Sequence, residues 1–125
     1  MTDHEIRVAN KHFYTDDDME NIIVTAIEGG IGYWACLDNT GADWDSKEKG
    51  IPVSVWCWKL LKEGKTLHFL EEEGDDEFYF SMESLYRGIG LAIQEGYWSG
   101  DPYDLDGDSA DAVFQLGLFE ELVYG

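Results

Sequence analysis

The residues with the clearest chemical potential are the aspartates of the stretch DPYDLDGDSAD, which holds five acids in eleven residues and no base. An EF-hand calcium loop uses such oxygen ligands at alternate positions, with glycine at position 6 and glutamate at position 12. Counted from Asp104, the first three ligand positions are Asp104, Asp106 and Asp108. Ser109 and Gln115 then occupy positions 6 and 12. The stretch departs from the calcium pattern at both diagnostic positions, so no residue is assigned as a metal ligand and a calcium-binding module is kept only as an alternative.

A helix start explains part of the same stretch. Asp108 or Ser109 can accept hydrogen bonds from the free backbone N–H groups at the start of a helix. Asp111 would then lie in the first turn of that helix, where negative charge is favoured. This interpretation leaves three aspartates without a structural role, namely Asp101, Asp104 and Asp106.

A second acidic run, EEEGDDE, has six acids in seven residues between two predicted strands. One such run is typical of a solvated hairpin loop, whereas two runs with almost no bases between them favour a surface that binds a basic partner. A third acidic group, Asp16–Asp18 with Glu20, lies at the start of a predicted helix. The candidate partner-binding residues are Glu71, Glu72, Glu73, Asp75, Asp76, Glu77, Asp101, Asp104, Asp106 and Asp108.

The acidity is concentrated in one half of the chain. The whole sequence has 27 acids and 8 bases, a net charge of −19. Residues 66–125 contain 15 of the acids and Arg87 as their single base, a net of −14. This half should repel nucleic acid and anionic membranes, so we expect a basic protein surface as its partner and no direct contact with nucleic acid or membrane. Acidity that only keeps an aromatic-rich protein soluble remains the alternative.

Catalysis finds little support in the sequence. The motifs HExxH, GxSxG, GxxxxGK[ST] and GxGxxG do not occur, and the three histidines are scattered. Cys36 and Cys57 lie in the apolar stretches YWACL and VWCWK, which predict buried thiols. Nothing in the sequence places Cys36 beside His68 as a thiolate pair. We therefore expect no enzymatic activity and no cofactor.

Hydrophobic periodicity predicts the elements that must position the acids. A helix begins after a Thr15 cap, carries Asp16–Asp18 in its first turn, and ends at Gly29 and Gly30. The sequence further predicts strands over Ile31–Leu37, Ile51–Leu61, Thr66–Leu70 and the stretch EFYFS, a helix from Ser81 to Gly96, and a helix from about Ser109 to Leu122.

These elements predict an α+β fold in which an antiparallel sheet of three to four strands packs against about three helices. Residues 1–125 would form a single globular domain, with residues 1–14 as a candidate mobile N-terminal segment. Gly88 and Gly90 lie inside the second helix and either permit close packing or break it. The N-terminus lacks a secretory signal and no apolar run is long enough for a bilayer, so we expect a cytoplasmic location.

Two stretches, NIIVTAIEGGIGYWACLDN and SADAVFQLGLFEELVYG, resemble small acidic proteins encoded by bacteriophages and prophages. They cover about a third of the chain, and their residues are structural in character. The resemblance implies an inhibitor of host defence in the bacterial cytoplasm, including the anti-CRISPR proteins and the anti-restriction DNA mimics. The leading hypothesis is accordingly a non-enzymatic DNA mimic that occupies the basic, PAM-reading surface of a CRISPR effector. A phage accessory or assembly protein with a merely solubilising acidic surface is the other alternative.

Overall fold

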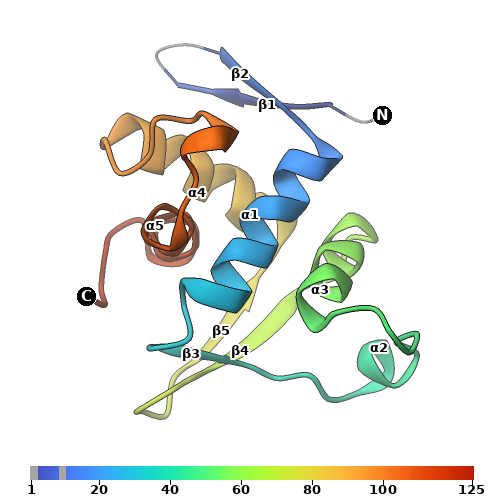
Figure 1. Cartoon of the computed structure of the whole chain (residues 1–125). Helices are drawn as coiled ribbons and strands as arrows, with labels where there is room; N and C mark the ends of the chain where they lie inside the picture. The colour runs from blue at the N-terminus through green and yellow to red at the C-terminus, as the bar shows by residue number, and fades with distance from the viewer. Residues whose placement is uncertain (1–2, 9–10) are drawn as a thin grey trace.

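The computed structural model describes residues 3–8 and 11–125. Within them, five α-helices, one short 3₁₀ helix and two small antiparallel sheets confirm the predicted α+β class, with five α-helices in place of about three. The hairpin of β1 and β2 lies at one end, the sheet of β3, β4 and β5 at the other, and α1, α4 and α5 between them (Figure 1). The strands are β1 (Asp3–Arg7), β2 (Lys11–Thr15), β3 (Ala35–Leu37), β4 (Leu67–Glu71) and β5 (Glu77–Phe80). The helices are α1 (Asp16–Gly29), α2 (Ala42–Asp45), α3 (Val53–Lys62), α4 (Met82–Gln94), η1 (Pro102–Asp104) and α5 (Gly107–Phe119).

The first helix follows the sequence prediction closely. The Thr15 side chain accepts from the Asp18 N–H, and the Asp18 carboxylate accepts from the Thr15 N–H, which completes a capping box. Met19, Ile22 and Ile23 lie on the buried face of α1. The predicted helix, its cap and its apolar face are therefore confirmed.

The segment predicted as a strand over Ile51–Leu61 is instead helix α3, and that prediction was wrong. The alternation of valines with tryptophans indicated a strand with two faces. Burial along the segment follows the helical spacing i, i+3, i+4 and i+7, with Ser54, Cys57, Trp58 and Leu61 buried. Leucine and lysine, both good helix formers, make up most of the second half of this segment. The segment is therefore helical, and its buried face packs against α1.

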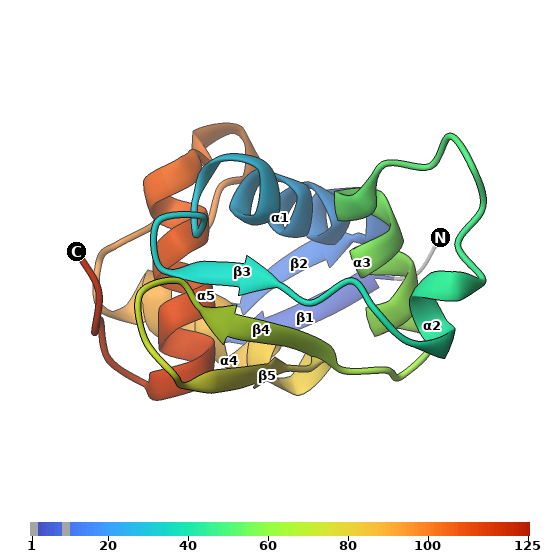
Figure 2. The ribbon, with the colours of Figure 1, turned by 90° about the horizontal axis from the view of Figure 1, so that it is seen from below.

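The three-stranded sheet has the order β3–β4–β5, with both pairs antiparallel. The strand predicted from Ile31 begins only at Ala35, because the N–H groups of Trp34 and Ala35 both donate to the Ile31 carbonyl in a turn. Phe69 and Phe80 face inward, where both rings meet the ring of Phe114 on α5. One face of the sheet is thus packed against α5, and Figure 2 shows the other face turned toward the viewer.

The hairpin β1–β2 occupies the N-terminal segment for which the sequence predicted no element. His4 is buried and anchors it, since its Nε2 lies 2.8 Å from the Asp16 carboxylate and its Nδ1 meets the Tyr86 hydroxyl. Lys62 and His4 hold the pKa of Asp16 below its usual range, in that order of importance. A polar cluster therefore ties β1 to α1, α3 and α4. Residues 1 and 2 of the candidate mobile segment, and residues 9 and 10, lie outside the described part of the chain.

The last helix starts and ends two to three residues earlier than predicted, over Gly107–Phe119. Its cap is Asp106, whose Oδ1 accepts from the Ser109 N–H at 2.8 Å, and not Asp108 or Ser109. At the other end Glu120 adopts a left-handed conformation with φ 60°, so the chain turns away before Leu122. In residues 3–8 and 11–125, no helix combines the length and apolar character that a membrane crossing needs.

Glycines let α4 and α5 pack with their backbones in contact. A Cβ atom added at Gly88 would lie 1.9 Å from the Val113 carbonyl oxygen. A Cβ atom at Gly117 would lie 2.3 Å from the Ser84 carbonyl oxygen. The Gly90 position is open by comparison, because a Cβ there would make ordinary contacts at 3.6 Å with Val8 and 3.7 Å with Ile6. Close packing, and not a broken helix, is therefore the role of Gly88.

This difference predicts opposite effects for two neighbouring substitutions. Gly88→Ala should lower the free energy of unfolding by roughly 1–3 kcal/mol or more, the cost of overpacking, because the backbone of the opposing helix must move. Gly90→Ala should raise the free energy of unfolding by up to about 1 kcal/mol through helix propensity. Urea unfolding of both variants measures the two values. Equal effects of the two variants would contradict the packing assigned to Gly88.

Candidate partner-binding surface

The β4–β5 turn presents the most concentrated charge on the described part of the chain. We use the term acidic turn for residues 71–77. Glu72, Glu73, Asp75, Asp76 and Glu77 are all exposed. The backbone closes the turn through the Glu71 N–H, which donates to the Asp76 carbonyl at 2.8 Å. Five carboxylates are thus displayed over six residues on a fixed hairpin.

Glu71, also predicted to bind the partner, has an internal role in the fold. Its Oε1 accepts from the Asp76 N–H at 3.3 Å, inside the turn. Its Oε2 accepts from the Tyr124 hydroxyl at 2.6 Å. The acidic turn is therefore tied to the C-terminal residues through the Glu71 carboxylate. Glu77 is paired with His68, and the carboxylates of Glu72, Glu73, Asp75 and Asp76 accept no hydrogen bond from the described residues.

Hydrogen bonds to Gln115 of α5 hold the C-terminal segment in place, a role that the sequence did not predict. The Gln115 side chain is 1% exposed, and its Oε1 accepts from the N–H groups of Val123 and Tyr124, both at 2.8 Å. The Tyr124 ring stacks on the Trp34 ring with centroids 4.9 Å apart. A glutamine buried in an apolar helix face was the one available signal, because such an amide needs backbone partners.

Asp111 was predicted in the first helical turn, but the helix starts at Gly107 and Asp111 binds side chains instead. Its carboxylate accepts from the Tyr33 hydroxyl at 2.5 Å and from Trp34 Nε1 at 2.8 Å. Two hollows of about 360 and 350 Å³ meet at Tyr33 and Tyr124. Glu71 and Glu73 line the first hollow, and Asp108 and Asp111 line the second. Asp108 thus lies on the same side of the molecule as the acidic turn.

The other three aspartates of DPYDLDGDSAD serve the local fold. Asp101 Oδ1 accepts from the Tyr103 N–H at 2.9 Å and caps η1, while Asp104 Oδ2 accepts from the Ser99 hydroxyl at 2.8 Å. Asp106 caps α5, and hydrogen bonds from Ser109 hold its pKa below the usual range. Asp101 follows Gly100, whose carbonyl accepts from the Tyr14 hydroxyl of β2 at 2.6 Å, so this part of the stretch lies beside the β1–β2 hairpin, at the opposite end of the molecule from the three-stranded sheet that carries the acidic turn (Figure 1). The ten predicted residues therefore do not share one face.

The outer face of the three-stranded sheet adjoins the acidic turn. Cys36, Leu70 and Glu77 lie side by side across the three strands, with Leu70 41% exposed. Tyr79, 60% exposed, stacks on His68 with ring centroids 4.7 Å apart. This face offers a small apolar and aromatic area beside the carboxylates.

His68 is held on that face between two carboxylates. Its Nδ1 lies 2.9 Å from Asp38 and its Nε2 lies 2.7 Å from Glu77. The hydroxyl of Thr40 and then His68 hold the pKa of Asp38 below its usual range. Cys57 is buried as predicted, and burial raises its pKa to about 12, but the prediction of a buried thiol was wrong for Cys36. Cys36 occupies the solvent side of a strand whose alternate residue, Ala35, faces inward.

The tryptophans divide between the core and its edge. Trp34, Trp56 and Trp58 are buried. Trp98 is also buried and donates from Nε1 to the Asp101 carbonyl at 3.1 Å. Trp44 is half-buried and packs against the core from α2. The exposed aromatic groups near the acidic turn are consequently tyrosines, Tyr33 and Tyr79.

Comparisons of the chain with protein-family models, with curated proteins and with solved structures find no match. Over residues 3–8 and 11–125, no group of three or more His, Cys, Asp or Glu side chains is arranged to hold a metal ion. The geometry of the described residues is thus the basis for any functional proposal.

The assignment of Asp106 as the α5 cap can be tested against its neighbour. Asp106→Ala should lower the free energy of unfolding by about 1 kcal/mol, and Asp108→Ala by only a few tenths. The folded-state pKa of Asp106 is depressed, so its stabilising effect belongs to the ionised carboxylate. The difference in free energy of unfolding between wild type and Asp106→Ala should therefore be largest above about pH 4, and should shrink as the pH falls through the folded-state pKa. Chemical denaturation at pH 7 and pH 3 measures it. A larger loss of stability from Asp108→Ala than from Asp106→Ala would show that Asp108 is the capping residue of α5.

The tyrosines around the two hollows predict a loss of stability in alkali. Burial and the bond to Asp111 raise the pKa of Tyr33 to about 12, and the bond to Glu71 and burial raise that of Tyr124 to about 12. Because the folded-state pKa of each tyrosine lies above the ordinary value of about 10, the protonated hydroxyls contribute their full stabilisation below pH 10. This contribution is lost as the pH rises toward 12.

Denaturant midpoints between pH 8 and pH 11.5 should therefore fall in the wild type and fall less in the Tyr33→Phe, Tyr124→Phe double variant. Tyr103→Phe is the matched control, because its ring is 97% exposed and should leave the slope unchanged. An unchanged slope in the double variant would contradict the role of these hydroxyls.

Proposed function

We propose that the chain is a non-enzymatic inhibitor that binds a basic nucleic-acid-binding protein as a mimic of DNA. The observation that carries the proposal is the acidic turn, where Glu72, Glu73, Asp75, Asp76 and Glu77 are exposed with no base among them. Held at a hairpin, these carboxylates cannot move apart to relieve their repulsion, so a cationic partner gains by neutralising them.

The charge spacing supports a mimic of the DNA backbone. Duplex DNA presents one negative charge per roughly 1.7 Å of its axis. The five exposed acids fall within six consecutive residues at the tip of the β4–β5 hairpin, so the acidic turn, like DNA, presents closely spaced negative charges. A groove lined with lysine and arginine for DNA would accept the acidic turn for the same electrostatic reason.

The surroundings of the acidic turn favour an arginine-rich partner surface. Tyr79 and Leu70 are exposed on the adjoining sheet face, and Glu77 belongs to both the face and the turn. A guanidinium can stack on an aromatic ring while it pairs with a carboxylate, which is how arginine contributes at interfaces. Since a PAM is read by arginines in CRISPR effectors, such an effector fits the resemblance and the surface together.

The proposal narrows the predicted site. Glu72, Glu73, Asp75, Asp76 and Glu77 form its centre, and Asp108 extends it across Tyr33. Asp101, Asp104 and Asp106 are assigned to the local fold, because each accepts a hydrogen bond from a neighbouring residue.

A charge-neutralised variant tests the proposal against the effect of net charge alone. The turn variant changes Glu72, Glu73 and Glu77 to Gln and Asp75 and Asp76 to Asn. The control variant removes the same number of charges at other exposed acids, with Asp45→Asn and with Glu48, Glu95, Glu120 and Glu121 changed to Gln. Basic proteins captured on the wild-type chain from a bacterial lysate at low salt are purified, and their binding to duplex DNA is measured with each variant as competitor.

The wild type and the control variant should displace DNA with similar potency, and the turn variant should be weaker by about ten-fold or more. Displacement should weaken as salt rises, because the attraction is electrostatic. If the captured protein binds DNA undisturbed at low salt, the mimic proposal is refuted. If both variants lose potency equally, net charge and not the acidic turn is responsible.

A further inference from the structure

The hollow of about 350 Å³ beside Tyr33 lies over one side of α5. Four residues of the helix form its floor, namely Asp108, Asp111, Ala112 and Gln115. They recur at intervals of three and four positions, so they lie on the same side of α5. Other segments of the chain form its walls, namely Tyr33, Tyr97, Leu122, Tyr124 and Gly125. We use the term tyrosine hollow for this site.

Two of the wall residues offer exposed aromatic rings. Tyr33 is 53% exposed and Tyr97 is 47% exposed. Tyr33 is held through its hydroxyl, which donates to the Asp111 carboxylate at 2.5 Å. Tyr97 is held through its backbone, because its N–H donates to the Ala92 carbonyl at 2.9 Å just after Gly96 turns the chain with φ 83°. Both residues are thus fixed in position while much of each ring stays open to a ligand.

The Asp111 carboxylate in the floor is bonded by neutral donors. It accepts from the Tyr33 hydroxyl, from Trp34 Nε1 at 2.8 Å and from Gln115 Nε2 at 3.0 Å. These bonds orient the carboxylate but leave its negative charge uncompensated. Asp111 is half-buried, so water and salt screen that charge less than they would on an open surface.

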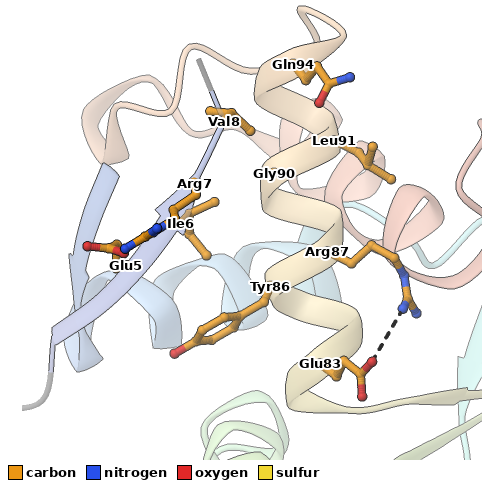
Figure 3. A pocket seen from close by; sticks show the side chains of 10 residues that line it. All are labelled: Glu5, Ile6, Arg7, Val8, Glu83, Tyr86, Arg87, Gly90, Leu91 and Gln94. Atoms are coloured by element: carbon orange, nitrogen blue, oxygen red, sulfur yellow. Dashed lines mark hydrogen bonds and ion pairs between the residues drawn. The ribbon is translucent and has the colours of Figure 1, made fainter. Parts of the chain in front are cut away.

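The bases of the chain do not supply the missing positive charge. Over residues 3–8 and 11–125, no ion pair involves Asp111 or the exposed Asp108 beside it. Arg87, the single base in residues 66–125, points toward Glu83 at 4.0 Å (Figure 3). Its guanidinium also donates to the Gly117 carbonyl. A cation from another molecule would therefore gain electrostatic attraction in the tyrosine hollow.

A guanidinium group matches this combination of aromatic rings and carboxylates. Its plane can stack on a tyrosine ring while its N–H groups pair with a carboxylate. A lysine ammonium lacks the plane and is more strongly hydrated, so it gains less from the same surroundings. Leu122, which is 40% exposed, offers an apolar contact for the methylene stem of an arginine side chain.

We propose that the tyrosine hollow binds an arginine side chain of the partner protein. The guanidinium contacts the rings of Tyr33 and Tyr97 and pairs with Asp108, and the stem of the side chain lies against Leu122. The site deepens the proposed function, because it names the side chain that is recognised beyond the acidic turn. It rests on that proposal for the identity of the partner, whereas its chemistry can be measured with a peptide.

Three capped tripeptides are the probes, each titrated into the intact protein: glycine–X–glycine with arginine, lysine or citrulline, the neutral isostere of arginine, at the centre. The Trp34 indole N–H reports binding in two-dimensional NMR spectra, because it donates to Asp111. The Trp56 indole N–H donates to the Asp43 carbonyl in another part of the fold and should not respond. The arginine peptide should shift the Trp34 resonance saturably, the lysine peptide should bind about three-fold or more weaker, and the citrulline peptide should not bind.

Substitutions at Tyr97 test the contribution of its ring. Tyr97→Ala should weaken binding of the arginine peptide about three-fold or more, because a cation–π contact is lost. Tyr97→Phe keeps an aromatic face and should stay within about two-fold of wild type. Tyr103→Ala is the matched control, since that ring is 97% exposed and does not line the hollow. Thermal unfolding confirms that each variant is folded.

Several results would overturn the proposal. They are a Trp34 resonance that does not respond to the arginine peptide, equally tight binding of the lysine or citrulline peptide, and full binding by folded Tyr97→Ala. The turn variant described above should still bind the arginine peptide, because its substitutions lie outside the hollow. Peptide binding by a chain that displaces no DNA would refute the mimic alone. DNA displacement without peptide binding would refute the tyrosine hollow alone.

Discussion

The backbone contact between α4 and α5 is the constraint on which the other features depend. Gly88 and Gly117 leave no room for a Cβ atom, because each faces a carbonyl oxygen of the opposing helix. The Arg87 guanidinium completes the contact through the Gly117 carbonyl. On the sheet side, the Phe114 ring of α5 stacks on Phe80 with centroids 4.0 Å apart. The position of α5 is thereby fixed between a helix and a sheet.

The position of α5 in turn fixes the parts of the molecule on either side of it. Gln115 and Asp111 fix the C-terminal segment and the Tyr33–Trp34 corner, and Tyr124 connects that segment to Glu71 in the acidic turn. On the other side, α4 packs against the hairpin, where a Cβ atom at Gly90 would contact Ile6 and Val8. The close helix pair therefore fixes the position of the acidic turn through α5 and the C-terminal segment.

The elements that could be predicted from the sequence are those with local signals. Thr15 and Ser81 are caps whose partners lie three residues away, and both appear as capping boxes in the structure. Helix α3 was misassigned because Val53 to Trp58 alternates like a strand, and only its packing on α1 settles the helical period. The hairpin β1–β2 carries polar residues whose burial depends on distant partners, as His4 does with Tyr86.

The acidic residues also divide into those whose role could be predicted from the sequence and those whose role could not. Charge density located the acidic turn correctly as a surface feature, since repulsion is visible in the sequence. The roles of Asp101, Asp104 and Asp106 were not visible, because capping depends on where a helix begins to within one residue. Glu71 was grouped with its neighbours because its partner, Tyr124, lies 53 residues away along the chain. Composition thus indicates where charge accumulates, and only tertiary contacts separate the structural carboxylates from the free ones.

The bond between Glu71 and Tyr124 has a consequence for how this protein can change over generations. One residue anchors the acidic turn, and the five exposed acids beside it make few demands on the core. The displayed side chains can therefore change from one sequence to another while the fold stays intact. The same separation of anchor from display makes the hairpin a convenient place to graft other recognition sequences.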